Sequence, residues 1–239
     1  MMERVRRVFD LAPYNDGFRE QFIRAALQGL PQGSRILDAG AGQLRYKKYC
    51  SHLSYVSQDF AQYSGAGNGA GLQTGTWDVS GIDIVCDITA IPEADETFDA
   101  ILCAEVFEHI PDPLRALGEF HRLLKPKGTL ILTTPFASLT HFAPYHHYSG
   151  FNEYFFRYHF SGRFLILKYE KSGNFFLYLA QELTRIPRVY RRYGVGRRMN
   201  ALALAAAAVL SLYLRRMSHL TKGSEELLYF GNHIVAERI

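Results

Sequence analysis

The sequence predicts an α/β protein built on a doubly wound, mostly parallel sheet. Short apolar runs of strand length alternate with helix-like segments over the first 136 residues, which is the pattern of β-α-β units. The first such run, residues 36–44, contains Gly40 and Gly42 at its end. A glycine turn after a first parallel strand is where these sheets bind nucleotide-like ligands. We therefore expect a ligand pocket that begins at this turn.

Local signals predict each element in chain order. Phe18, Phe22 and Ile23 recur at helical spacing, and the continuous apolar run 98–103 is typical of a strand covered on both faces. Pro111 and Pro113 suit the start of a helix. The expected elements are helix 14–29, strand 34–39, a helix through about residue 51, strands 53–59, 82–87 and 98–103, helix 112–124, strands 129–134 and 164–169, helices 175–192 and 197–218, and a strand over 228–237.

Length and composition are those of one globular domain over residues 1–239. The chain is 48% apolar and 21% charged, ordinary values for a soluble protein. Its three cysteines are widely spaced, and the first ten residues lack the apolar run of a signal peptide, so we expect a cytoplasmic location. We divide the domain into an N-terminal helix (1–33), a cofactor-binding core (34–172), a basic helical insertion (173–223) and a last strand (224–239).

The net charge of +4 hides an asymmetry. Nine basic residues and no acidic residue lie between 183 and 224, whereas the rest of the chain carries 18 basic and 23 acidic residues. A basic segment of this kind suits an anionic surface, or is a solvated helix face. Within it, the apolar stretch 199–214 is shorter than the ~20 residues of a membrane span. A packed helix is the first interpretation, a membrane-surface or dimer helix the second, and a span the third.

The spacing of acidic residues favours a nucleoside ligand. Asp59 ends the second predicted strand, 21 residues after Asp38, and an acid at this distance commonly binds ribose hydroxyls. A helix cap is the alternative role for Asp59. The dinucleotide fingerprint requires a third glycine where this chain has Arg45, and the Gly-Lys-Ser/Thr of a phosphate-binding loop is missing from the sequence.

These residues resemble the class I S-adenosylmethionine-dependent methyltransferases. The motifs that carry the resemblance are 36–42, Asp59, Asp87-Ile88, Phe98-Asp99-Ala100-Ile101 with Glu105-Val106-Phe107-Glu108-His109, and 123–130. The resemblance implies a Rossmann-like sheet of seven strands in the order 3-2-1-4-5-7-6, with strand 7 antiparallel and the helical insertion between strands 6 and 7. It implies S-adenosyl-L-methionine as cofactor, bound by Asp38, Ala39, Gly40, Gly42, Asp59, Phe60, Asp87, Ile88, Ala104 and Glu105.

Two features depart from the family pattern. Gln43-Leu44 follows the second glycine where relatives often have another small residue, so we expect a wider turn or a side chain that covers the cofactor. Thr134-Pro135-Phe136 does not resemble the Asn/Asp-Pro-Pro-Tyr/Phe signature of amino-group methylation. Methylation of a nucleic-acid base is therefore disfavoured.

A histidine- and tyrosine-rich segment follows the fifth predicted strand. Transfer to a hydroxyl needs a base for its proton, and His141 and His146 are the candidates, with His147, Tyr145 and Tyr148 in reserve. The alternative is that these side chains line an aromatic core or an acceptor pocket without moving protons. His109 is assigned a structural role. No metal is expected, His146-His147 being the nearest approach to a ligand pair.

The leading function is therefore methyl transfer to a hydroxyl of a small molecule, sugar, or glycan- or lipid-linked acceptor. The alternative is a catalytically silent protein of this fold that binds an anionic membrane surface or nucleic acid. A nicotinamide oxidoreductase ranks third. The partners that follow are a small-molecule or glycan acceptor, peripheral membrane contact through the basic insertion 185–222, and a homodimer, with nucleic acid less favoured.

Overall fold

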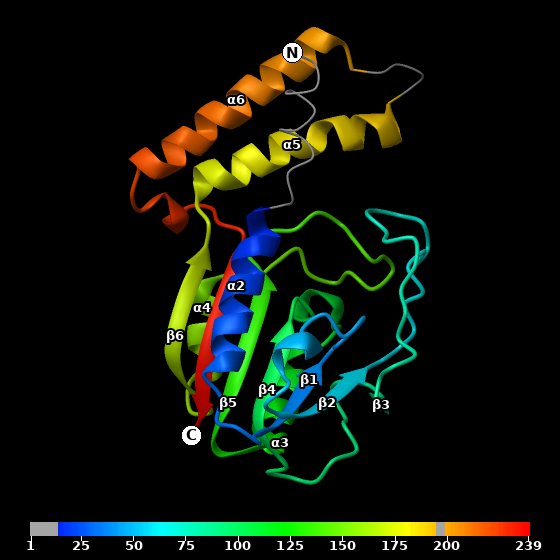
Figure 1. The fold of residues 1–239 in the computed structure, drawn as a ribbon, viewed down its shortest axis with the longest axis vertical. Helices are drawn as coiled ribbons and strands as arrows, with labels where there is room; N and C mark the ends of the chain where they lie inside the picture. Colours follow the sequence, from blue (N-terminus) through cyan, green and yellow to red (C-terminus); the bar gives the residue numbers. More distant parts are fainter. Residues whose placement is uncertain (1–13, 195–198) are drawn as a thin grey trace. The chain divides into compact units, whose positions relative to one another are not determined.

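Strands and helices alternate in the predicted order (Figure 1). The computed structural model describes residues 14–194 and 199–239, so residues 1–13, Arg197 and Arg198 lie outside the described part. The elements are α2 (Tyr14–Gln28), β1 (Arg35–Ala39), η1 (Lys47–Tyr49), β2 (Ser54–Asp59), β3 (Ile84–Val85), β4 (Phe98–Ala104), η2 (Phe107–His109), α3 (Pro113–Leu123), β5 (Leu124–Pro135), α4 (Glu153–Phe160), β6 (Phe164–Ser172), α5 (Phe175–Tyr193), α6 (Ala201–Leu220), η3 (Ser224–Glu226) and β7 (Gly231–Arg238).

One seven-stranded sheet has the order β3-β2-β1-β4-β5-β7-β6. Leu37 of β1 lies opposite Val56 of β2 and Ile101 of β4, and both pairings are parallel. β7 runs antiparallel to β5, with Leu132 opposite Ile234. The predicted fold, including the strand order and the reversed seventh strand, is confirmed. Right-handed β-α-β connections bring the carboxyl ends of β1, β2 and β4 to one edge of the sheet.

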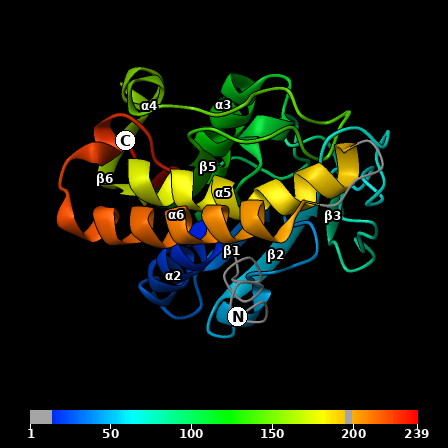
Figure 2. The ribbon, with the colours of Figure 1, turned by 90° about the horizontal axis from the view of Figure 1, so that it is seen from above.

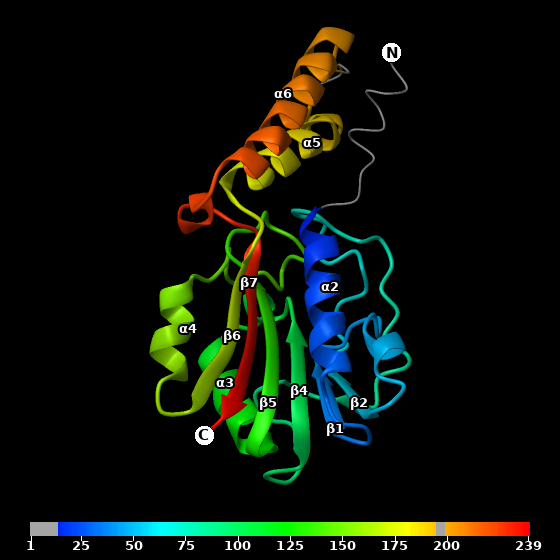
Figure 3. The same cartoon turned by 60° about the vertical axis from the view of Figure 1, so that its left-hand side comes forward.

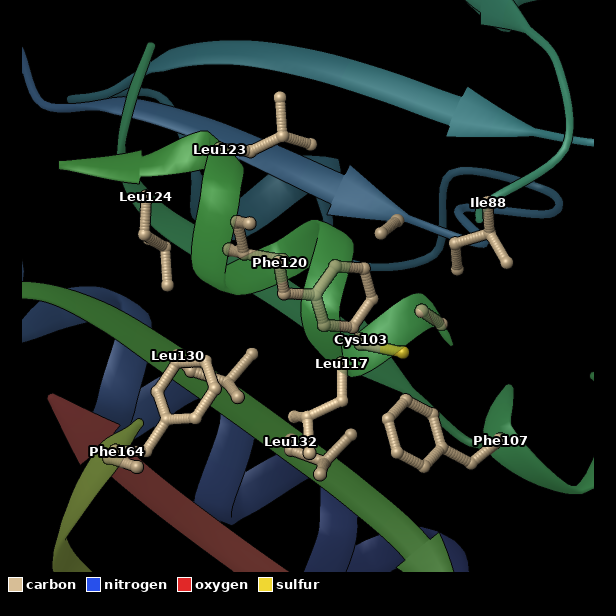
Figure 4. Close-up of a cluster of buried hydrophobic side chains, with 14 of the residues drawn as sticks. Ile88, Cys103, Phe107, Leu117, Phe120, Leu123, Leu124, Leu130, Leu132 and Phe164 are labelled. Atoms are coloured by element: carbon tan, nitrogen blue, oxygen red, sulfur yellow. The ribbon is translucent and has the colours of Figure 1, made fainter. Parts of the chain in front are cut away.

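Both faces of the sheet are buried. Because side chains alternate across a strand, Leu37 and Leu132 join a core with α3 and α4, whereas Ile36 and Ile131 join a second core with α2. Figure 3 shows α2 on one face and α3 and α4 on the other, and Figure 4 shows the first of these cores. Coverage of both faces explains the continuous apolar runs of β4 and β5.

Helix α3 begins where the prolines predicted. Asp112 accepts a hydrogen bond from the backbone N–H of Arg115, and Pro113 occupies the first turn, where its missing N–H costs nothing. The helix buries Phe120 completely, in ring contact with Phe107 of η2. Truncating such a phenylalanine to alanine costs about 3–5 kcal/mol. Packing of α3 therefore fixes η2, which carries part of the site.

Two local predictions were wrong, and one helix was not predicted. The chain after β1 forms turns and the single-turn η1 instead of a helix through residue 51, and Leu44 has a left-handed backbone, with φ of 58°. β3 is shorter than predicted because the Asp83 carboxylate accepts the Ser57 N–H at 2.8 Å, in place of a strand hydrogen bond. α4 was not predicted, although Asn152 caps it by accepting the Phe155 N–H.

The described chain forms two compact units. Residues 19–170 and 231–239 contain the sheet, and residues up to 18 together with 171–230 contain α5 and α6. In the second unit, α5 and α6 lie side by side (Figure 2), and the buried Ser211 hydroxyl donates to the Ala180 carbonyl. By length and composition α6 could cross a membrane, and 17% of its apolar window is buried.

Candidate active site

A cavity of about 500 Å³ lies at the carboxyl ends of the first parallel strands, a size typical of small-ligand sites. The predicted cofactor residues that line it are Gly40, Gly42, Asp59, Phe60, Asp87, Ile88 and Glu105. Asp38, Ala39 and Ala104 are not among its lining residues, although each lies at the end of β1 or β4. The strand-end motifs thus converge on one cavity within the sheet unit.

The two glycines of the turn are required by their surroundings. Gly40 and Gly42 have positive φ angles of 77° and 51°, which side chains rarely adopt. A Cβ on Gly40 would lie 2.5 Å from Val106, and one on Gly42 would lie 2.7 Å from Trp77. The turn therefore keeps its bare backbone against the cavity, where a ligand can approach closely.

The end of β2 holds the turn in place. Asp59 accepts hydrogen bonds from the N–H groups of Gly42 at 2.9 Å and Ala61 at 2.8 Å. Its neighbour Gln58 accepts from the Gly40 N–H and donates to the Cys86 carbonyl at 2.8 Å. A carboxylate oxygen has a second lone pair, so Asp59 can still accept from a ligand hydroxyl. Gln58 was missed by the sequence analysis, although it directly precedes the acid.

Asp38 is buried beneath the turn. Its carboxyl accepts a hydrogen bond from the Tyr55 hydroxyl at 2.7 Å. Burial raises the pKa of Asp38 to about 7, opposed by the Tyr55 hydrogen bond and reinforced by the nearby charge of Asp59. A cationic ligand group near this carboxyl would favour its charged form.

Two other acids of the cavity wall have protein partners. Glu105 pairs with Arg19, Oε2 to Nη1 at 3.1 Å, and adopts a left-handed backbone with φ of 56°. Asp87 accepts from both the N–H and the hydroxyl of Thr89 at 2.8 Å. These contacts fix the two carboxylates on opposite sides of the turn.

An aromatic cluster forms another wall. Tyr63 stacks on Phe142 with ring centroids 4.6 Å apart, and Trp77 meets both rings edge-on. All three rings line the cavity. The glycine-rich loop 65–75 is tightly turned, with five glycines at positive φ. It pairs with the histidine-rich segment, since the Leu72 N–H donates to the Thr140 carbonyl at 2.9 Å.

Only some of the clustered histidines line the cavity. His109 and His147 do, whereas His141 and His146 do not. His109 stacks on Phe142, and its ring lies 4.7 Å from the ring of His141, which in turn lies 4.9 Å from His146. The structure thus gathers the predicted base candidates into one cluster next to His109, the histidine that the sequence had assigned a structural role.

Glu108 lies beneath this cluster and was not singled out from the sequence. Its backbone carbonyl accepts from the N–H groups of His147 and Tyr148, which ties the histidine-rich segment to η2. Burial and the charge of Glu105 raise the pKa of the Glu108 carboxyl well above its usual range. Burial, followed by the neighbouring His141, lowers the pKa of His109 to about 3.

The sheet order, glycine turn and strand-end acids are together those of a class I methyltransferase. The chain matches the family model of the methyltransferase domain over residues 14–201. It therefore belongs to this family, and the resemblance to the S-adenosylmethionine-dependent methyltransferases is confirmed.

Individual relatives agree with this assignment. The chain is 31% identical over 119 residues to a ubiquinone biosynthesis O-methyltransferase of Xanthomonas axonopodis, covering 48% of each chain. A Pseudomonas aeruginosa protein of the same name is 44% identical over 50 residues, or 20% of this chain and 22% of its own. The chain therefore spans about half or less of the length of the curated relatives it matches.

Solved structures share the fold. The cyclase SpnF superimposes with a TM-score of 0.54 at 19% identity, over 92% of this chain and 80% of its own. The YcgJ protein of Bacillus subtilis gives 0.52 at 12% identity, over 92% and 98%. At this identity the similarity concerns the fold alone. The fold alone therefore does not identify the acceptor.

Proposed function

We propose that this protein transfers the methyl group of S-adenosylmethionine to a hydroxyl of a small molecule. One observation carries the proposal: a single cavity combines the glycine turn and strand-end acids with a wall of histidine and aromatic side chains. The first part suits the cofactor, and the second suits an acceptor that must lose a proton. The names of the ubiquinone biosynthesis relatives support an oxygen acceptor.

The reaction is a displacement at the methyl carbon. The acceptor oxygen forms a bond to carbon while the carbon–sulfur bond breaks, and the sulfur keeps the electron pair. The sulfonium already activates the methyl group, so the protein mainly aligns the two reactants. The Gly40 turn and Asp59 would hold the cofactor, and Asp87 its adenosine.

The proton of the acceptor goes to a base. His147 lines the cavity and is solvent-exposed, so it can pass a proton to water, and we favour it for this role. His141 and His146 remain candidates that would act through the histidine cluster. Burial, followed by His147, lowers the pKa of His146, which keeps its imidazole neutral and able to accept a proton at neutral pH.

A labelled-methyl transfer screen tests the proposal. Hydroxylated aromatics and prenylated phenols come first, then sugars, glycans and lipid-linked acceptors. We expect label on the oxygen of at least one class, and slower transfer in Asp59→Asn at low cofactor concentration, because that variant should bind the cofactor more weakly. Transfer only to nitrogen, or tight cofactor binding with no transfer to any class, would contradict hydroxyl methylation. The second result would favour the catalytically silent alternative.

We further infer that the α5–α6 pair contacts an anionic lipid surface. Several apolar side chains of α6 are strongly exposed, among them Leu202 (79%), Val209 (67%) and Leu212 (50%). Exposed arginines lie at the end of α5, at positions 188, 191 and 192. Apolar side chains next to arginines are the pattern of interfacial helices, and the acceptor could then be lipid-linked.

Vesicle flotation tests this contact. A triple change of Arg188, Arg191 and Arg192 to Gln should reduce binding to phosphatidylserine vesicles by about 100-fold, since each basic residue contributes about 1 kcal/mol. Neutral phosphatidylcholine vesicles should bind weakly. Equal binding to both vesicle types, or a stable homodimer or a salt-sensitive nucleic-acid complex without vesicle binding, would overturn it.

The matched control removes the same charge elsewhere. Arg115, Arg157 and Arg163 are exposed residues of the sheet unit. Changing these three to Gln lowers the net charge equally. Vesicle binding should then remain close to that of the unchanged protein.

A further inference from the structure

Three ligand-type side chains converge next to the cavity. Glu108 Oε1 lies 3.7 Å from His109 Nε2 and 3.8 Å from His141 Nε2. The three ligand atoms all lie within 4.8 Å of one another. Two of these residues come from η2 and the third from the segment after β5. The fold therefore brings together residues that are more than 30 positions apart.

The Glu108 side chain is only 1% exposed. Among the described residues its Oε2 atom has no hydrogen-bond partner. Burying an unpaired carboxyl oxygen is costly. The two histidines do not hydrogen-bond the other carboxyl oxygen, because their Nε2 atoms lie 3.7 and 3.8 Å from Oε1, which exceeds hydrogen-bond length. A cation between the three groups would compensate the buried carboxylate.

Both histidines are oriented in the way that metal ligands are. His109 Nδ1 contacts the Tyr145 carbonyl, and His141 Nδ1 lies 2.8 Å from the Leu139 carbonyl. A carbonyl only accepts, so each Nδ1 carries the proton and donates it. Each Nε2 then keeps its lone pair toward Glu108. Hydrogen bonds of this type fix the tautomer and ring orientation of metal-bound histidines.

We propose that Glu108, His109 and His141 bind one divalent transition-metal ion of the Zn²⁺ type. Two imidazoles and one carboxylate suit zinc and its late first-row neighbours, whereas Mg²⁺ and Ca²⁺ prefer oxygen ligands. Three protein ligands leave a coordination position for water or substrate, as in catalytic zinc sites. The histidine side chains are 14% and 22% exposed, so an ion can reach the site.

A role in catalysis follows from the position of His109, which lines the cavity. This step rests on the proposed function. A hydroxyl acceptor bound to the ion would lose its proton more easily, because a divalent metal lowers the pKa of a bound hydroxyl. The oxygen would then form its bond to the methyl carbon as the carbon–sulfur bond breaks. The proton would pass to solvent or to a nearby histidine.

Metal titration tests the site without any methyl-transfer assay. The full chain is stripped with EDTA and titrated calorimetrically with Zn²⁺, then with Mg²⁺, and Co²⁺ is followed by its visible absorption. We expect one Zn²⁺ per chain, no comparable Mg²⁺ binding, and Co²⁺ bands typical of low coordination number. His141→Ala and Glu108→Gln should each weaken Zn²⁺ binding by on the order of 100-fold or more, at least the effect of losing a supporting hydrogen bond.

The matched control is His159→Ala, which removes a histidine of α4 outside the group. Zn²⁺ affinity should stay unchanged in this variant. Binding of S-adenosylhomocysteine, measured for every variant, reports whether the cofactor region is folded. Because Glu108 is buried, His141→Ala on the partly exposed segment is the decisive variant. Zn²⁺ binding that is absent, or that is equal in His141→Ala and the unchanged protein, overturns the site. Specific Zn²⁺ binding without methyl transfer to any hydroxyl upholds the site and contradicts the proposed function.

Discussion

The cavity has two walls that are built in different ways. The wall formed by β1 and β2 presents backbone and strand-end carboxylates, and Asp59 ties it together through two backbone N–H groups. The opposite wall presents side chains from η2 and from the histidine-rich segment, which is held by pairing with the loop at Leu72. The difference indicates that cofactor recognition is fixed by the backbone of the sheet, whereas acceptor chemistry is carried by side chains on loops.

The largest expected effect concerns the free energy of unfolding that is lost because Asp38 is buried in the first wall. The pKa of Asp38 is about 7 in the folded protein, against about 4 in an unfolded chain. The folded state therefore holds the extra proton between these values, so the contribution of Asp38 to stability is greatest below pH ~4 and is lost as the pH rises to about 7. The loss is up to about 4 kcal/mol. Thermal unfolding of the ligand-free protein across this range measures it.

Asp38→Asn should remove this contribution from the pH dependence of stability, because the amide oxygen still accepts from Tyr55 and carries no charge. The variant should be more stable than the unchanged protein above pH 7 and should bind S-adenosylhomocysteine more weakly. An unchanged slope of stability against pH in Asp38→Asn would assign the titration to another group.

The next largest effect is expected when a side chain is added to a glycine of the turn. Gly40→Ala places a methyl group against Val106 and should weaken S-adenosylhomocysteine binding about 100-fold, or about 3 kcal/mol. The control is Gly33→Ala, which has a similar φ of 81° but no atom within 4 Å of the added Cβ. It should cost only the ~1–2 kcal/mol of stability from the left-handed backbone. Equal affinity losses in both variants would mean that backbone strain, and not the close approach of Val106, explains why the turn needs glycine.

A comparison within the second wall follows. His147→Ala should lower kcat about 100-fold, the lower range for loss of a general base, with little change in the KM for the cofactor. His146→Ala, outside the cavity lining, should have the smaller effect. The reverse order of effects would return the role of base to His146.

The smallest effect concerns one hydrogen-bonded carboxylate. Asp59→Asn keeps the shape but turns an NH₂ group toward either Gly42 or Ala61, leaving an N–H unpaired at a cost of about 1–3 kcal/mol. We expect about tenfold weaker S-adenosylhomocysteine binding. Asp78→Asn makes the same change in an exposed turn, where Asp78 accepts from the Ser80 N–H, and calorimetry should find its affinity unchanged.

The first wall could be predicted from the sequence, and most of the second could not. Strand periodicity and the glycines locate Gly40, Gly42, Asp59 and Asp87 because those signals are local. The helix predicted after β1 does not form, because tertiary contacts of the turn override the helix propensity of these residues. The partners of the histidine-rich segment depend on a loop about 70 residues earlier in the chain, and no local pattern reports that pairing. The sequence placed Glu108 in a family motif but gave it no role of its own, because its importance arises from burial beneath that segment.

The central claim is that the cavity beside the glycine turn takes S-adenosylmethionine. Calorimetric titration of the chain with S-adenosylhomocysteine, in parallel with NADH, tests it most directly. The proposed site predicts one S-adenosylhomocysteine per chain with micromolar or tighter affinity, and no binding of NADH. Binding of NADH in its place, or no binding of S-adenosylhomocysteine by the folded chain, would contradict the claim.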